Sequence, residues 1–177
     1  MKSLVFIADF YADTIRGGAE IVNDILIDGL QSRGYNITKL TSAEVTDSVL
    51  QQHKNKIFIV ANFVGLDQKI IHQFQDLNYI IFEHDHKYLK TRDPSPFSDY
   101  VAPADQIINR EFYQKAIAVI CQSEIHSKVV RQNLNIFNVI NLGCSLWSEE
   151  ELKIIRKNLS ASKNGKCAIL NSNNRIK

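Results

Sequence analysis

The chain opens with an apolar run, a nine-residue loop and a pair of glycines. Residues 4–20 read Leu4-Val5-Phe6-Ile7-Ala8-Asp9-Phe10-Tyr11-Ala12-Asp13-Thr14-Ile15-Arg16-Gly17-Gly18-Ala19-Glu20. The first five residues are typical of a buried strand, and the glycine pair stands where a helix begins. Such a junction presents unbonded backbone N–H groups and the positive end of a helix dipole to a phosphate. The loop is too long and too poor in glycine for the dinucleotide-binding turn G-x-G-x-x-G, so we expect a phosphate site of another kind.

Apolar runs of strand length alternate with helical patterns along the rest of the chain. The expected strands are 4–8, 35–40, 57–62, 79–83, 117–121 and 137–141. Helical patterns start near Ala19 and end at Gly34, and further ones cover 41–53, 66–74, 105–115 and 123–133. This alternation is typical of an α/β domain with a parallel sheet. We therefore expect a Rossmann-like parallel sheet with helices on both faces.

Length and composition indicate one globular domain outside the membrane. A chain of 177 residues with 45% hydrophobic and 23% charged residues can bury a hydrophobic core without disulfides or bound metals to stabilise it. No run approaches the roughly 18 apolar residues of a transmembrane segment, and the first residues do not resemble a signal peptide. Cys121, Cys144 and Cys167 contain no C-x-x-C pair, which argues against a disulfide framework or a zinc site. We expect a cytoplasmic protein with reduced cysteines.

The last thirty residues differ from the rest. Ser148 precedes three glutamates and starts a helix, a polar linker follows at 160–165, and a new strand is expected at 166–170. Residues 152–177 contain seven basic residues and no acid. Because apolar residues separate them, we interpret them as a solvated helix and the entry to a further domain rather than a nucleic-acid-binding arm. The expected domains are 1–147 and 148–177, the second being the start of a truncated C-terminal domain.

Three stretches resemble the N-terminal half of a retaining GT-B glycosyltransferase of the large group 1 (family 4) type. The first is Gly17-Gly18-Ala19-Glu20. The second is Phe82-Glu83-His84-Asp85-His86, after the fourth expected strand. The third starts with Ala118-Val119-Ile120-Cys121-Gln122-Ser123 and ends with Val139-Ile140-Asn141-Leu142-Gly143. The order and spacing of the three carry the likeness over nearly the whole chain, although the aspartate that commonly follows the last glycine in that family is missing.

The resemblance implies a domain that helps to transfer a sugar from a nucleotide-sugar donor to a sugar, lipid or protein acceptor. It places the donor sugar and phosphate at Arg16, Gly17 and Gly18. His84 and Asp85 are the catalytic candidates in this interpretation, with His84 contacting the sugar or diphosphate and Asp85 orienting a hydroxyl. His86, Lys87 and Arg92 are candidates on the acceptor side. The donor is a co-substrate, so no cofactor and no metal are implied, and the missing C-terminal donor-binding domain leaves this half inactive alone.

The residues themselves leave other interpretations open. His84 and His86 share one face of an extended segment, where they could ligate a metal, bond to the loop backbone or contact a sugar. A metal-dependent hydrolase built on Glu83 to His86 and a non-enzymatic binding module that uses the tail strand are the alternative functions. A nicotinamide-dependent dehydrogenase is disfavoured because Lys39-Leu40-Thr41 provides no acid after the second strand. The sequence has no stripe of basic and aromatic residues, so we do not expect a nucleic acid as a partner.

Overall fold

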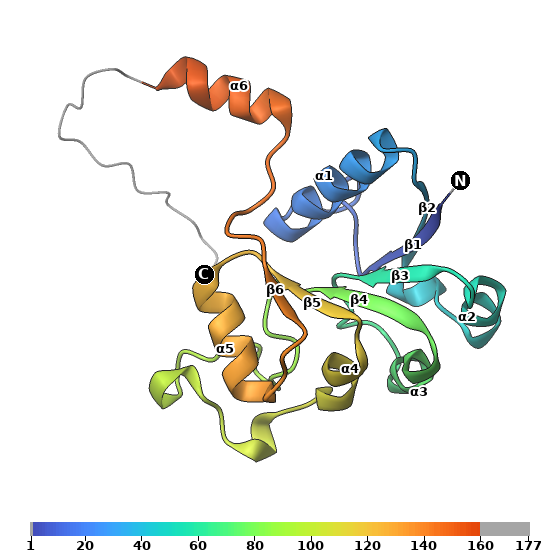
Figure 1. Cartoon of the computed structure of the whole chain (residues 1–177), viewed down its shortest axis with the longest axis vertical. Coiled ribbons are helices and arrows are strands. Elements are labelled where there is room, and N and C mark those ends of the chain that lie inside the picture. Colours follow the sequence, from blue (N-terminus) through green and yellow to red (C-terminus); the bar gives the residue numbers. More distant parts are fainter. Residues whose placement is uncertain (1, 160–177) are drawn as a thin grey trace. The chain divides into compact units, whose positions relative to one another are not determined.

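The protein forms a six-stranded parallel sheet with helices on both faces (Figure 1). The computed structural model describes residues 2–159. The strands are β1 (Ser3–Ala8), β2 (Asn36–Thr41), β3 (Ile57–Val60), β4 (Asn78–Phe82), β5 (Ala118–Cys121) and β6 (Val139–Asn141). They lie in the order β2-β1-β3-β4-β5-β6, and every neighbouring pair is parallel. The expected fold class is confirmed.

The sheet separates two cores because successive residues of a strand face opposite sides. Val5 and Ile7 belong to the larger core, whereas Leu4, Phe6 and Ala8 belong to the smaller one. The smaller core packs under α1 (Gly18–Ser32). The larger core is covered by α2 (Asp47–His53), α3 (Gln68–Gln73), α4 (Arg110–Lys115) and α5 (Glu124–Leu134). Both faces of the central strands are therefore buried, which explains their nearly continuous apolar sequence.

Several helix boundaries differ from the sequence-based expectation. The pattern at 41–53 forms a 3₁₀ turn (Ser42–Glu44) and then α2, because the Thr41 and Glu44 side chains close one capping box and Thr46 caps a second start. The pattern at 105–115 becomes a 3₁₀ turn (Ala104–Gln106) and the short α4, which begins after Asn109 adopts a left-handed conformation with φ of 54°. The expected left-handed Gly34 after α1 is confirmed, with φ of 83°.

The long loop between β4 and α4 is anchored to the core. It contains two 3₁₀ turns, Ser98–Tyr100 and Ala104–Gln106, and Leu89 pairs with Ile107 in an isolated antiparallel bridge. Tyr88 and Leu89 are fully buried. Tyr88 therefore supports the loop from inside and is not available to contact a ligand.

The chain divides into two compact units, one ending at Leu146 and the other starting at Trp147. In the second unit, α6 (Glu149–Asn158) begins with a capping box formed by Ser148 and Glu151. The linker at 160–165 and the strand at 166–170, which the sequence predicts, lie outside the described residues. No helix within residues 2–159 has the length and apolar character that crossing a membrane requires.

Candidate functional site

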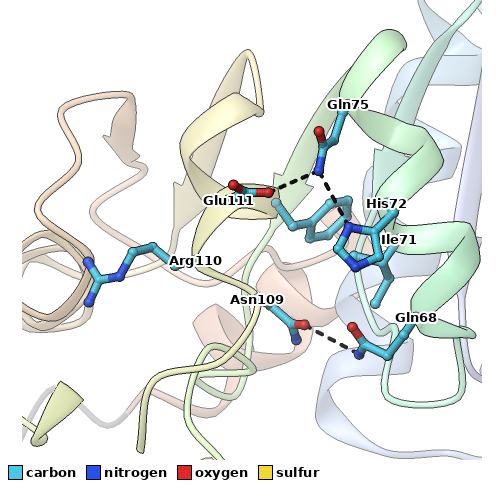
Figure 2. Close-up of a pocket in the computed structure, with 8 residues that line it drawn as sticks. Gln68, Ile71, His72, Gln75, Asn109, Arg110 and Glu111 are labelled. Carbon is cyan, nitrogen blue, oxygen red and sulfur yellow. Dashed lines mark hydrogen bonds between the residues drawn. The ribbon is translucent and has the colours of Figure 1, made fainter. Parts of the chain in front are cut away.

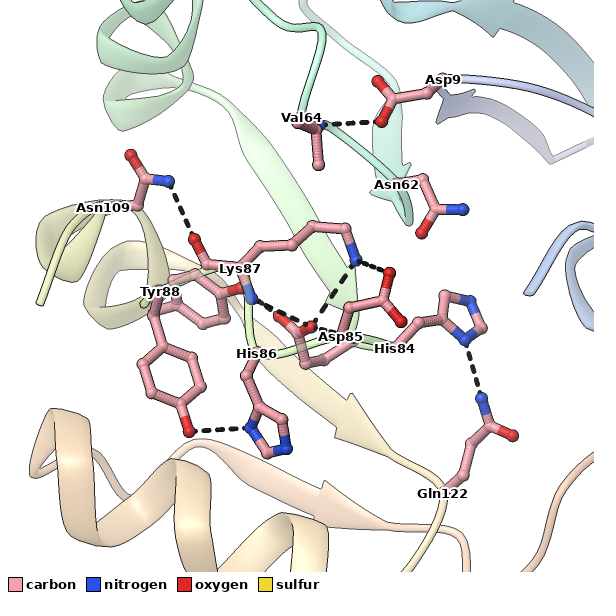
Figure 3. A network of polar contacts seen from close by, with 12 residues as sticks. Asp9, Asn62, Val64, His84, Asp85, His86, Lys87, Tyr88, Asn109 and Gln122 are labelled. Atoms are coloured by element: carbon pink, nitrogen blue, oxygen red, sulfur yellow. Dashed lines mark hydrogen bonds and ion pairs between the residues drawn. The ribbon is translucent and has the colours of Figure 1, made fainter. Parts of the chain in front are cut away.

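Polar side chains follow the central strands at the carboxyl edge of the sheet, where parallel sheets bind their ligands. Asp9 comes directly after β1, Glu83 after β4 and Gln122 after β5, and Asn62 stands two residues after β3. The strand order reverses between β1 and β3, so this edge is also the place where the adjacent loops diverge. We call the group formed by Asn23, Asn62, His84, Asp85 and Lys87 the polar corner. Figure 3 labels all of these residues except Asn23.

Asp9 has a structural role at this edge. Its carboxylate accepts hydrogen bonds from the Ser42 hydroxyl at 2.6 Å and from the backbone N–H groups of Val64 and Gly65, both at 2.9 Å. These bonds join the loops after β1, β2 and β3. The Asp9 carboxylate therefore stabilises the loops that border the site.

Glu83 and Lys87 form a buried charged pair beneath the polar corner. Glu83 is fully buried and accepts hydrogen bonds from the Tyr113 hydroxyl and, at 2.8 Å, from the Asp85 N–H. The Lys87 ammonium lies 3.7 Å from Glu83 Oε1 and 3.6 Å from Asp85 Oδ2. Burial alone would raise the pKa of Glu83, but the Lys87 charge and then the Tyr113 hydroxyl lower it to about 2. Glu83 is therefore ionised at neutral pH and buried, so it cannot exchange protons with a ligand.

His84 is held as a neutral imidazole between two amides. Gln122 Nε2 donates a hydrogen bond of 2.9 Å to His84 Nδ1. The N–H at His84 Nε2 donates to Asn23 Oδ1 on α1, also at 2.9 Å. Burial, followed by the charge of Lys87, lowers the pKa of His84 to about 4. With both ring nitrogens bonded, His84 orients Asn23 and Gln122 rather than acting as a general base in this arrangement. The polar corner therefore faces the first turns of α1.

His86 and His126 form a histidine pair on the α5 side. Their ring centroids are 4.4 Å apart, and His86 Nδ1 shares a hydrogen bond of 2.8 Å with the Tyr88 hydroxyl. His86 has a left-handed backbone with φ of 53°. Burial lowers the pKa of both rings, that of His86 to about 4. Both side chains line a pocket of about 320 Å³, whose other walls are Pro94, Tyr100, Ile125 and Val129.

The start of α1 is open at Gly18 and occupied at Gly17. A methyl group at Gly18 would meet no other residue, whereas one at Gly17 would meet the Glu20 carboxylate, which folds back over the helix start. Glu20 Oε1 accepts a hydrogen bond of 3.0 Å from Asn62 Nδ2, which links α1 to the polar corner. Arg16 is exposed, and its side chain bonds to no other described residue. A carboxylate of the chain itself thus lies where the sequence predicts a phosphate.

Most of the orphaned polar atoms lie at this edge. Within the described part of the chain, five buried side-chain atoms have no hydrogen-bond partner: Asn23 Nδ2, His53 Nδ1, Asn62 Oδ1, Lys87 Nζ and His126 Nε2. All but His53 belong to the polar corner or to the histidine pair beside it. They include two donors, one acceptor and an imidazole nitrogen that can serve as either. Unpartnered buried groups of this kind are costly. Because each of these atoms is shielded from solvent, a ligand can bond to it only after neighbouring side chains turn aside.

The polar corner includes two residues that sequence reasoning missed. Of the predicted site residues, His84, Asp85 and Lys87 meet there, His86 lies beside His126, and Arg92 lines a separate pocket described below. Asn23 and Asn62 were not predicted. Asn62 could have been found because it follows a strand, and Asn23 because it interrupts the buried face of α1. Among residues 2–159, no three or more His, Cys, Asp or Glu side chains are grouped so that they could hold a metal ion.

A further pocket, of about 270 Å³, lies between α3 and α4 (Figure 2). Its polar side chains bond to one another. Gln75 Nε2 donates to Glu111 Oε2 at 3.0 Å, and Gln68 Nε2 donates to Asn109 Oδ1 at 3.4 Å. No orphaned polar atom lines it, so it lacks the unsatisfied groups that mark the polar corner.

Comparisons with known proteins leave the family open. No protein-family model and no curated protein sequence matches this chain. Among solved structures, the chain is similar to a flavodoxin of Streptococcus pneumonia TIGR4, with 15% sequence identity and a TM-score of 0.34 over 88% of this chain and 92% of that one. Similarity at this level carries no argument about function. The functional conclusion therefore depends on the residues at the carboxyl edge.

Proposed function

We propose that the polar corner binds the sugar of an activated donor or its acceptor, and that the chain is the acceptor-side half of a nucleotide-sugar-dependent glycosyltransferase. The observation that carries this proposal is the set of orphaned polar atoms. Lys87 Nζ and Asn23 Nδ2 need acceptors, and Asn62 Oδ1 needs a donor. A sugar hydroxyl both donates and accepts, whereas a phosphate only accepts. A polyhydroxylated ligand therefore satisfies this mixed set better than an anion does.

The surrounding groups suit the transfer of a sugar. Asp85 has a side chain that is 42% exposed beside the Lys87 ammonium, so its carboxylate is available to accept a hydrogen bond from a hydroxyl. His84 holds the Asn23 amide in a fixed orientation. Gly18 leaves the N–H groups at the start of α1 approachable by a diphosphate, provided that the Glu20 carboxylate moves aside. Such fixed dipoles stabilise the charge that develops on a departing diphosphate.

Nuclear magnetic resonance of the ¹⁵N-labelled chain tests the proposal directly. UDP-glucose, GDP-mannose, UDP and glucose are titrated separately while the side-chain amides of Asn23, Asn62 and Gln122 are followed. We expect saturable shifts at these amides with the sugar-containing ligands. Half of a cleft binds weakly, so affinities in the millimolar range, about 4 kcal/mol, are expected. Shifts with UDP alone would instead indicate a nucleotide site, and no shift with any sugar would refute the proposal.

Two variants sharpen the result. His84→Gln removes the imidazole that bridges two amides and should abolish the shifts at Asn23, whereas His72→Gln on the exposed surface of α3 should leave them unchanged. Gly18→Ala places a methyl group in open space, so the variant should fold normally. It should nevertheless weaken the binding of UDP-glucose more than that of glucose, because only the former carries a diphosphate. Equal weakening of both would argue against a diphosphate at α1.

A further inference from the structure

A third, smaller pocket adjoins the polar corner on the β3 side. It has a volume of about 160 Å³. The lining residues are Phe63, Val64, Gln68, Ile71, Lys87, Leu89, Lys90, Arg92, Ile108 and Asn109. We call it the basic pocket, because three of these side chains are cationic and none is acidic. Lys87 belongs to both sites, so the basic pocket and the polar corner adjoin at this residue.

The positive charge of the basic pocket comes mainly from Lys90 and Arg92. The Lys87 ammonium is compensated by Glu83 and Asp85. Lys90 and Arg92 are exposed and form no ion pair with any residue in the range 2–159. Two uncompensated cations beside a concave, partly apolar surface produce a local positive potential that attracts an anion.

The backbone fixes where these two cations lie. Lys90 N–H donates to the Gln106 carbonyl at 3.1 Å, next to the bridge between Leu89 and Ile107. Arg92 N–H donates to the Leu89 carbonyl at 3.1 Å and has a left-handed backbone with φ of 57°. A non-glycine residue in this conformation is strained and requires support from its surroundings. The turn therefore holds Arg92 in place at a cost in backbone energy.

The two pockets described above have a different chemistry. The pocket between α3 and α4 contains Glu111, and its polar groups bond to one another (Figure 2). The pocket beside α5 is lined by His86 and His126, which stay neutral because burial lowers the pKa of both. Of these three pockets, the basic pocket is the one that suits an anion.

We propose that the basic pocket binds an oxyanion group, a phosphate or a carboxylate, of the acceptor. The proposal rests on the proposed function and takes the sugar bound in the polar corner next to it to be that of the acceptor. A volume of about 160 Å³ is below the range of whole-ligand sites, so the pocket accommodates one anionic group rather than a nucleotide. The Arg92 guanidinium can bind such a group with two hydrogen bonds, and Lys90 adds a point charge. The acceptor is thus an anionic sugar or the sugar headgroup of an anionic lipid.

Titration of the ¹⁵N-labelled chain with matched ligands tests this inference. Glucose, glucose 6-phosphate, glucuronate and inorganic phosphate are compared, together with phosphatidylcholine vesicles with and without phosphatidic acid. We expect glucose 6-phosphate or glucuronate to bind about tenfold more tightly than glucose, with shifts at the Lys90 and Arg92 backbone amides. If only the vesicles containing phosphatidic acid produce these shifts, the oxyanion is that of a lipid. No shift at Lys90 and Arg92 with any of the anions would overturn the inference.

A charge-matched pair of double variants separates a specific pocket from general attraction. Lys90→Gln/Arg92→Gln should remove the tenfold advantage of the anionic ligands, whereas Lys54→Gln/Lys128→Gln, which removes two exposed charges elsewhere, should retain it. Equal losses in both would overturn the inference.

The two proposals fail separately. If glucose shifts the Asn23 and Asn62 amides and an anionic group adds no affinity, the proposed function stands and the inference about the basic pocket is overturned. Phosphate shifts at Lys90 and Arg92 without any sugar effect at the corner would overturn the proposed function and leave the anion site.

Discussion

Replacing Lys87 by methionine should strongly destabilise the fold, by an amount that depends on pH. The substitution leaves the fully buried Glu83 carboxylate without the cation that lies 3.7 Å away. Breaking a buried ion pair by removing one partner costs about 3–5 kcal/mol. The pKa of Glu83 leads to a similar magnitude, since its lowering from 4.5 to about 2 corresponds to about 3 kcal/mol of stabilisation of the ionised form.

The Lys87→Met substitution should reverse the sign of the contribution that Glu83 makes to the pH dependence of folding stability. In the unaltered chain the pKa of Glu83 is lowered on folding, so its stabilising effect is complete above about pH 4.5 and is lost as the pH falls towards 2. Without Lys87, burial becomes the dominant effect and raises this pKa in the folded chain. A carboxyl group with a raised pKa in the folded chain destabilises the fold at neutral pH. This loss of stability is recovered as the pH falls through the raised pKa. The difference in the free energy of unfolding between the unaltered chain and the Lys87→Met variant should therefore be larger at pH 7 than at about pH 4.

Urea unfolding followed by circular dichroism at both pH values measures this difference. Lys90→Met, which removes an exposed lysine without an ion pair, should change the free energy of unfolding by no more than about 0.5 kcal/mol. The double variant Glu83→Gln/Lys87→Met should recover much of the loss, because no buried charge remains. A cost below about 1 kcal/mol for Lys87→Met, or the same cost at both pH values, would show that water already screens the pair and would refute the reasoning.

Three further substitutions test other parts of the structure. Tyr113→Phe removes the hydroxyl that donates to Glu83, so it should cost about 1.5–3 kcal/mol in urea unfolding and move acid unfolding to a higher pH as the pKa of Glu83 rises; an unchanged acid transition would contradict this assignment. Gly34→Ala should cost about 1 kcal/mol, since φ is 83° there, whereas Gly18→Ala should be nearly neutral in the same assay. Ser148→Ala should lose about 1 kcal/mol of helix stability in α6, seen as faster amide exchange at Glu151, and unchanged exchange would show that the cap contributes little.

The sequence pointed to part of the candidate site. His84, Asp85 and Lys87 were singled out through the resemblance to a glycosyltransferase, and they lie at one edge because the carboxyl ends of parallel strands meet there. Their individual roles were not predictable. Two histidines separated by one residue look equivalent in sequence, yet His84 bonds to Asn23 on α1 while His86 turns towards His126 on α5. The left-handed backbone of His86 separates them, and loop conformation of this kind is set by tertiary contacts.

By itself, the sequence determined the α/β class, because buried parallel strands need apolar residues on both faces and the helices between them need one apolar stripe each. It also determined which loops meet at the carboxyl edge of the sheet. Only the tertiary structure decided which polar atoms there remain without a partner. Asn23 is 61 residues from His84, and no local pattern brings them together, yet they share a hydrogen bond. Burial and hydrogen bonding depend on contacts between distant segments, and these contacts hold Glu83 ionised and His84 neutral at the same edge of the sheet.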